Sequence, residues 1–151
     1  MSRISRDQMF MEIAQVVAKR GTCDRAQVGA VLVNDNTKNI IAIGYNGAPS
    51  GEPHCDTYGH DLKDNHCTRA IHAEVNCLMK ACDYYHTTIP LTLYVTHYPC
   101  MGCTVELVKA KLRNMNIHRV VYLIPYGVDD LPLVREKLFE AGGIKVEQYV
   151  G

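Results

Sequence analysis

The sequence predicts an α/β protein in which helices flank one sheet. Runs rich in β-branched residues alternate along the chain with segments of helical apolar periodicity, and this alternation predicts strands joined by right-handed crossovers. The chain has 151 residues, 47% of them hydrophobic, which is a common size and composition for one domain with its own core. We therefore expect a single domain over residues 1–151.

The first third of the chain predicts a helix followed by a hairpin. The segment Ser5-Arg6-Asp7-Gln8 matches a capping box at a helix start. Apolar residues then recur at helical spacing as far as Gly21, and these residues are Met9, Ile13, Val16 and Val17. Two β-branched runs, residues 28–33 and 40–45, enclose the polar residues 34–39 and predict two strands with a connecting loop.

Residues 46–68 have little periodic apolar content. Glycine and proline interrupt this segment repeatedly, at Gly47, Pro49, Gly51, Pro53 and Gly59. An irregular segment of this length is too long for a passive connection, so we expect it to carry function.

The remainder of the chain alternates regularly between the two kinds of element. The predicted helices cover residues 70–82, 100–114 and 131–141, and the predicted strands cover residues 91–96, 119–124 and 145–149. The last helix ends at Gly142-Gly143, a typical helix stop.

Two short motifs supply three metal ligands and one carboxylate. His72-Ala73-Glu74 is followed about two dozen residues later by Pro99-Cys100-Met101-Gly102-Cys103. A structural zinc takes four protein ligands, whereas a catalytic zinc keeps one position for water or substrate. Since His72, Cys100 and Cys103 make three ligands, the pattern favours an enzyme.

The predicted helix starts explain how these motifs can meet. His72 lies near the start of one helix and the two cysteines near the start of the next, so free N–H groups and positive helix ends converge and favour thiolates. Glu74 can accept a proton from an attacking water and deliver it to a ring nitrogen and a leaving amine. A His/Cys/Cys zinc site with a non-ligand Glu is the established pattern of nucleobase deaminases.

Each motif alone also has a simpler interpretation. A Pro-Cys-x-x-Cys segment can be a structural zinc knuckle or a redox pair. A His near a helix start can be an ordinary capping or core residue, and a Glu in the first turn can merely complement the helix dipole. The combination of both motifs, at suitable separation and on predicted helix starts, favours the catalytic centre.

The charge balance argues against a polyanionic partner. The chain has 16 basic and 16 acidic residues, so no basic field marks a nucleic-acid binder, and a small-molecule substrate is expected. No apolar run approaches the length of a membrane span and no signal segment is evident, so we expect a cytoplasmic protein, in the host cytoplasm if it is viral. Seven cysteines in a cytoplasmic chain favour metal binding or burial over disulfides.

The sequence resembles the zinc-dependent cytidine and deoxycytidylate deaminase superfamily, and most closely its deoxycytidylate (dCMP) deaminases of phage and bacterial type. Besides the metal motifs, the resemblance rests on Thr22–Arg25, Val28–Val31, Gly44–Pro49, Pro53–Cys55, His66–Arg69, Val120–Tyr122, Tyr126, Asp129 and Ala141-Gly142. It implies a three-layer α-β-α sandwich around a mixed five-stranded sheet. It also implies a hydrolase that converts dCMP to dUMP and ammonia and so supplies dUMP for thymidylate synthesis.

The resemblance further implies regulation, assembly and a set of site residues. The family forms homo-oligomers, often hexamers, that dCTP activates and dTTP inhibits, generally with Mg²⁺. Carried over by position, His72, Cys100 and Cys103 would bind zinc and Glu74 would move protons. The expected substrate-binding residues are Arg25, Asn46, His72, Ala73, Glu74 and Tyr98.

Individual tasks follow for some of these residues. Asn46 would contact the sugar and the Ala73 backbone would read the cytosine edge, while His97 and Tyr98 could stack on or bond to the base. Arg25 is our candidate for the 5′-phosphate, with a solvated surface arginine as the alternative.

Two further sites are expected around the long loop. Effector triphosphates would contact its start, at Asn46, Gly47 and Ala48. A second, structural zinc would take Cys23, His54 and Cys67 with the fourth ligand left open. The alternative is that these are buried thiols and surface histidines.

Three other functions are compatible with parts of the sequence. A nucleoside cytidine deaminase needs no phosphate-binding cation and lacks the Gly44–Pro49 loop followed by His54-Cys55. A tRNA adenosine deaminase shares both metal motifs but needs a basic surface. A zinc-stabilised binding module would keep the metal yet tolerate loss of Glu74.

Overall fold

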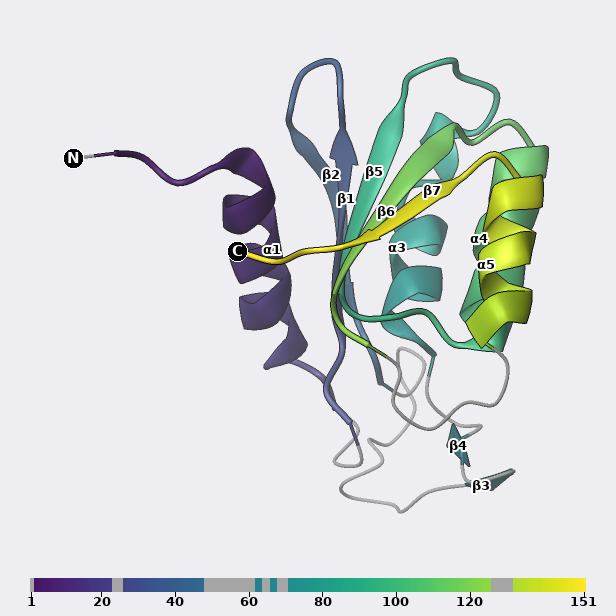
Figure 1. The fold of residues 1–151 in the computed structure, drawn as a ribbon, viewed down its shortest axis with the longest axis horizontal. Coiled ribbons are helices and arrows are strands. Elements are labelled where there is room, and N and C mark those ends of the chain that lie inside the picture. Colours follow the sequence, from purple (N-terminus) through teal and green to yellow (C-terminus); the bar gives the residue numbers. More distant parts are fainter. Residues whose placement is uncertain (1, 23–25, 48–61, 64–65, 68–70, 126–131) are drawn as a thin grey trace.

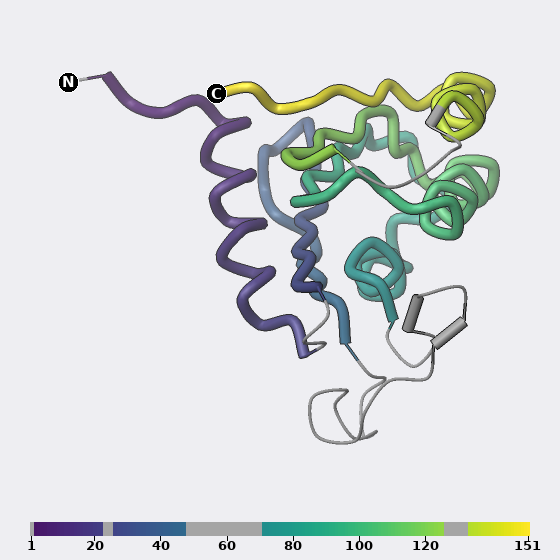
Figure 2. The backbone as a smooth tube through the Cα atoms, turned by 60° about the horizontal axis from the view of Figure 1, so that its bottom comes forward, coloured from purple at the N-terminus to yellow at the C-terminus, as the bar shows by residue number. Residues whose placement is uncertain are grey.

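The computed structural model has three layers. It describes residues 2–22, 26–47, 62–63, 66–67, 71–125 and 132–151. The first layer is α1 (Arg6–Ala18), the second is a five-stranded sheet, and the third contains α3 (Ala73–Lys80), α4 (Met101–Leu112) and α5 (Pro132–Ala141) (Figure 1). In Figure 2, α1 runs alone along one side of the sheet and the other three helices lie on the opposite side. The predicted α-β-α sandwich is confirmed.

The sheet is mixed, with the strand order β2-β1-β5-β6-β7. Its strands are β1 (Gly29–Asn34), β2 (Ile40–Tyr45), β5 (Leu91–His97), β6 (Ile117–Ile124) and β7 (Lys145–Gln148). β1 is antiparallel to both β2 and β5, whereas β5, β6 and β7 are mutually parallel. The parallel strands are connected through α4 and α5, because a parallel pair needs a crossover and cannot be closed by a tight turn.

Most predicted elements agree with the structure to within a few residues, and two short features were not predicted. A small antiparallel pair, β3 (Leu62–Lys63) and β4 (His66–Cys67), lies within the long segment that we expected to be irregular. A 3₁₀ turn, η1 (Cys82–Tyr84), follows α3 where the predicted helix continued. Both are too short to produce a period in the sequence. None of the helices in the described part of the chain has the length and apolarity to cross a membrane.

The start of α1 forms half of the predicted capping box. The Gln8 N–H donates to Ser5 Oγ at 3.0 Å, but the Gln8 side chain donates to Glu12 Oε1 and does not return to the Ser5 backbone. The predicted apolar stripe was wrong for Met9 and Val16, which are 38% and 62% exposed. The buried face comprises Phe10, Met11, Ala14, Val17 and Ala18.

Small residues explain this choice of face. A Cβ on Gly29 would lie 2.1 Å from the Ala14 carbonyl oxygen, so α1 and β1 are in backbone contact at this point. Only a helix face with alanine at the crossing can approach that closely. Two cores result, one between α1 and the sheet and a larger one between the sheet and the other three helices.

A second close approach brings β2 to the start of α3. A Cβ on Gly44 would lie 2.4 Å from the Ala73 carbonyl oxygen. Immediately after β2, Gly47 and Ile71 form an isolated antiparallel bridge, with N···O distances of 3.1 and 2.6 Å. These contacts fix the end of β2 beside His72, so the fold places the Asn46 segment next to the predicted metal ligands.

Candidate metal centre

Three predicted ligands converge where two helices begin. His72 is the N-cap of α3, Cys100 is the N-cap of α4, and Cys103 lies in the first turn of α4. His72 Nδ1 lies 3.4 Å from Cys100 Sγ and 3.2 Å from Cys103 Sγ. Among the residues that the structure describes, these three form the group of His, Cys and acidic side chains able to hold a metal ion, with all donor atoms within 4.8 Å of one another.

The chemistry and spacing of the donors fit zinc. Zinc binds imidazole nitrogen at about 2.0 Å and thiolate sulfur at about 2.3 Å, so tetrahedral geometry puts the two kinds of donor about 3.5 Å apart. The observed N···S separations are close to this value. One imidazole and two thiolates also bind zinc better than they bind harder divalent cations such as Mg²⁺.

The start of α4 stabilises negative charge on sulfur. The Cys103 N–H faces Cys100 Sγ at 3.5 Å, as expected for an N-cap. A hydrogen bond from the Cys103 thiol, together with bonds from His72 and the Cys103 backbone, lowers the pKa of Cys100 to about 4. The same shared proton raises the pKa of Cys103, with burial adding to the effect. A cation bound between the two sulfurs would replace this shared proton and make the second thiolate favourable.

Glu74 lies beside this cluster in the first turn of α3. Only 4% of its surface is exposed, and burial raises the pKa of its carboxyl above the usual value. A hydrogen bond from the Cys103 side chain opposes that shift without cancelling it. A carboxyl with a raised pKa accepts a proton more readily than an ordinary one, which is a property expected of a general acid and base.

Asn46 anchors the segment that precedes β1. Its Oδ1 accepts from the Val28 N–H at 2.8 Å and its Nδ2 donates to the Ala26 carbonyl. The side chain is 7% exposed and still has one N–H and one lone pair to offer. Gly47 uses both its N–H and its carbonyl in the bridge with Ile71. A direct role for these two residues in binding a ligand remains a prediction.

Tyr98 and Ala73 are both buried next to the ligands. Tyr98 is 7% exposed, and its ring packs edge-on against Tyr122 and Phe139 at centroid distances of 4.8 and 6.2 Å. This environment belongs to the larger core, and the predicted contact of Tyr98 with a base stays a prediction. Ala73, which is completely buried, leaves only its backbone for recognition.

Sequence reasoning did not find Arg135 in α5. Its guanidinium lies over the Tyr98 ring at 4.8 Å and donates to the Pro99 carbonyl at 3.2 Å. No local pattern distinguishes it from the other charged residues of the same helix, because its proximity to Pro99 results from the packing of α5 against α4.

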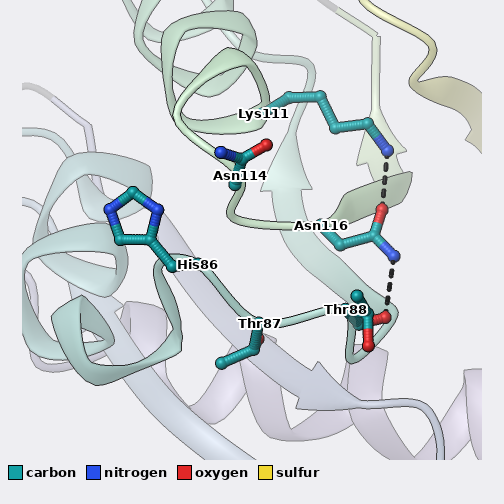
Figure 3. A pocket seen from close by; sticks show the side chains of 6 residues that line it. All are labelled: His86, Thr87, Thr88, Lys111, Asn114 and Asn116. Carbon is teal, nitrogen blue, oxygen red and sulfur yellow. Dashed lines mark hydrogen bonds between the residues drawn. The ribbon is translucent and has the colours of Figure 1, made fainter.

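A surface depression of about 450 Å³ lies at the other end of β5 and α4 (Figure 3). Its lining residues are His86, Thr87, Thr88, Lys111, Asn114 and Asn116. Lys111 Nζ donates to Asn116 Oδ1 at 2.7 Å, and Asn116 Nδ2 donates to the Thr88 carbonyl at 3.2 Å. Neither a thiol nor a carboxylate is among these described lining residues, so they do not form a second group of metal donors like that at His72.

Several predicted site residues fall outside the described part of the chain. These are Arg25, Ala48, Cys23 and His54, and for Cys67 the structure describes only the backbone in β4. The predicted phosphate contact and second zinc site are therefore still predictions, as is the part of the effector site that involves Ala48.

Comparisons with known proteins match most of the chain. The family model of the cytidine and deoxycytidylate deaminase zinc-binding region matches residues 4–122. ComE operon protein 2 of Bacillus subtilis is 38% identical over 148 residues, which are 98% of this chain and 73% of that protein. The deoxycytidylate deaminase of Mycobacterium phage D29 is 40% identical over 133 residues, which are 81% of this chain and 97% of that protein.

A solved structure extends the likeness to three dimensions. The dCMP deaminase of cyanophage S-TIM5, crystallised with dCMP and dUMP, has a TM-score of 0.75 and 26% identity, covering 99% of this chain and all of that one. The matched family region contains all three ligands and Glu74. The family model, the relatives and the fold therefore show that the chain belongs to the cytidine and deoxycytidylate deaminase family.

Proposed function

We propose that this chain catalyses the zinc-dependent hydrolysis of dCMP to dUMP and ammonia. The observation that carries the proposal is the buried carboxyl of Glu74 beside the converging donors of His72, Cys100 and Cys103. The choice of substrate is supported by the relatives, since the phage D29 protein is a deoxycytidylate deaminase and the cyanophage protein was crystallised with dCMP and dUMP.

The protein's own residues would perform the proton transfers. When bound, a zinc ion with three protein ligands acts as a Lewis acid that makes water a nucleophile near neutral pH. Glu74 accepts a proton from water while the water oxygen bonds to C4 of the cytosine. Glu74 then donates this proton to N3. Glu74 then carries the second water proton to the exocyclic amine as the bond from C4 to nitrogen breaks. The raised pKa of Glu74 suits both directions of transfer.

The proposed substrate contacts come from the residues that directly follow β2 and β5, from the start of α3, and from Arg25. Asn46 would use its remaining N–H on the sugar, and the Ala73 backbone would contact the cytosine edge at the start of α3. Tyr98 would form part of the base pocket, and Arg25 would bind the 5′-phosphate. A variant in which Arg25 is replaced by Gln should raise KM for dCMP far more than KM for cytidine, because cytidine has no phosphate.

Regulation and assembly are also part of the proposal. We expect a homohexamer of single-domain subunits, spanning residues 1–151, that supplies dUMP for thymidylate synthesis and responds to dCTP and dTTP with Mg²⁺. If the effectors bias two conformations, dCMP kinetics should be sigmoidal and dCTP should make them hyperbolic. Hyperbolic rates that neither triphosphate changes would contradict regulation and leave the chemistry intact.

A second zinc, bound by Cys23, His54 and Cys67, would be structural. Metal analysis of the purified protein tests it directly. About two zinc ions per chain would support this site. About one zinc per chain, in protein purified without chelators, would contradict it.

A substrate panel tests the central proposal. Wild type and Glu74→Gln should be compared on dCMP, on cytidine and on a tRNA hairpin containing adenosine, with zinc content measured for both proteins. We expect turnover of dCMP by wild type and a nearly complete loss in the variant, with the zinc retained. Turnover that survives the substitution, or that prefers cytidine or the hairpin, would contradict the proposal.

A further inference from the structure

Arg135 is buried in a way that requires explanation. Only 1% of its surface is exposed. Among the described residues whose side chains are almost completely buried, Arg135 is the largest. Removing a guanidinium from water is costly unless hydrogen bonds and favourable charge contacts compensate. The groups that Arg135 contacts should therefore indicate what its burial achieves.

Two of its contacts are with the turn that carries the predicted ligand Cys100. Arg135 Nη1 donates to the Pro99 carbonyl at 3.2 Å, and Pro99 immediately precedes the ligand Cys100. The guanidinium also covers the ring of Tyr98 at 4.8 Å, within the range of a cation–π contact. One side chain from α5 thus holds two successive residues between the end of β5 and the start of α4.

A second side chain holds the same turn from α4. Thr104 Oγ1 lies 3.5 Å from the Pro99 carbonyl oxygen and donates to the Cys100 carbonyl at 2.9 Å. Because proline has no N–H, residue 99 cannot be secured by a backbone donor bond. Instead, Arg135 bonds to the Pro99 carbonyl and Thr104 bonds to the Cys100 carbonyl, so side chains from two helices hold successive carbonyl groups of this turn.

We infer that Arg135 is a positioning residue that holds the Tyr98-Pro99-Cys100 turn in the geometry required for metal binding. This inference depends on the proposed metal centre at His72, Cys100 and Cys103. Groups that orient metal ligands without touching the ion commonly change metal affinity or activity by about 10–100-fold when removed.

The test measures zinc retention rather than turnover. Zinc-loaded wild type, Arg135→Met and Arg135→Lys are mixed with a chromogenic chelator well below the lowest melting temperature, and the release rate is recorded. We expect Arg135→Met to release zinc about tenfold faster or more. Arg135→Lys, which keeps a charge and a donor but loses the planar face, should fall between Arg135→Met and wild type, and it keeps the test valid if the methionine variant does not fold.

Arg119 in β6 provides a matched control. It also lies over a tyrosine ring, that of Tyr94 at 6.0 Å, but it belongs to the opposite face of the sheet. Arg119→Met should be destabilised yet release zinc at close to the wild-type rate. A second readout is the visible spectrum of the cobalt-substituted proteins, which reports ligand geometry and should change in the Arg135 variants but not in Arg119→Met.

The outcomes separate this inference from the proposed reaction. Wild-type release rates and spectra in both Arg135 variants would overturn it, and so would equal acceleration in the Arg119 control, because global stability would then govern release. Wild-type protein that binds no zinc would overturn both the metal centre and this inference. Protein that releases zinc as expected but does not deaminate dCMP would overturn the proposed substrate and support the role of Arg135.

Discussion

The two faces of the central sheet each hold a cluster of titratable side chains, and they use charge in opposite ways. On the α1 face, Arg119 bonds to Asp7 at 2.7 and 3.1 Å and also contacts Glu147, while the Tyr94 hydroxyl donates to Asp7 at 2.6 Å. On the other face, Glu74, Cys100 and Cys103 surround the His72 imidazole, and all three become negative when they ionise.

The pKa shifts express the same contrast. The hydrogen bond from Arg119 lowers the pKa of Asp7, and the bond to Asp7 raises the pKa of Arg119, so both groups are stabilised in their charged forms. Burial raises the pKa of Glu74, so its charged form is disfavoured. The first arrangement favours stability, whereas the second is arranged to receive a cation and exchange a proton, as expected of a functional site.

The largest expected effect is on kcat, and it comes from removing the carboxyl of Glu74 beside His72, Cys100 and Cys103. Glu74→Gln should lower kcat for dCMP by about 10²–10⁴-fold, because the proton transfers lose their carrier. Zinc content should be unchanged, since Glu74 is not among the converging ligands. Steady-state kinetics with metal analysis of the same preparations measure both quantities.

The same substitution should stabilise the metal-free protein at neutral pH. Because the pKa of Glu74 in the folded state lies above its usual value of 4.5, its contribution to stability is fully present below that value and is lost as pH rises through the folded pKa. Glutamine has no such loss. The melting temperature of metal-free Glu74→Gln should exceed that of wild type near pH 7, and the difference should disappear near pH 4. A variant that is less stable at both pH values would contradict the proposed cost of burying this carboxyl.

Removing the metal should have the next largest effect. A ligand present at about 1,000 times its dissociation constant stabilises a protein by about 4 kcal/mol, which corresponds to roughly 10 °C in melting temperature for a chain of this size. Chelation should therefore lower the melting temperature of wild type by about this amount. Cys103→Ala should lose less on chelation than wild type, because only the proposed second zinc would then remain to be removed. An equal loss in both proteins would mean that the stabilising metal lies elsewhere.

The sequence was sufficient to predict most of the fold and to single out three side chains that the structure brings together. His72-Ala73-Glu74 and Pro99–Cys103 are each short motifs of distinctive residue types, and the alternation of strands and helices predicted the three layers. The face of α1 was harder to predict, because Met9 and Val16 are as apolar as the buried residues. Their exposure follows from the contact of Gly29 with Ala14, which depends on tertiary packing.

Arg135 illustrates a second limit. Nothing in residues 131–141 separates this arginine from Lys137 or Glu136, yet it is buried against a turn located 36 residues earlier. Local propensity and periodicity describe a helix and its apolar face, and they contain no information about which polar residue meets a neighbouring element. Residues that position predicted ligands through contacts from another element are therefore harder to predict from sequence than the ligands themselves.

A smaller effect, on stability, is expected at the Asp7, Tyr94 and Arg119 cluster on the α1 face. Arg119→Met should lower the free energy of unfolding by about 1–2 kcal/mol, because it removes charged hydrogen bonds that are partly exposed to solvent. The melting temperature should fall by about 4 °C, while kcat for dCMP stays at the wild-type value. A large loss of activity would show that the Arg119 cluster also affects catalysis, and the two faces of the sheet would then not have separate roles.

The smallest effect is the pH dependence of Asp7. Its folded pKa lies below the usual 3.8, so its contribution to stability is present above that value and is lost as pH falls through the folded pKa. In urea unfolding, the stability difference between wild type and Asp7→Asn should be under about 1 kcal/mol at pH 6, since the pair is partly exposed, and should shrink toward pH 3. Glu106→Gln, which removes a carboxylate from the exposed pair with Lys109, is the matched control. If the stability difference between wild type and Asp7→Asn did not change with pH, the Asp7 carboxylate would act through packing rather than through its charge. The α1 face would then no longer differ from the face of the metal centre in how ionised groups contribute to stability.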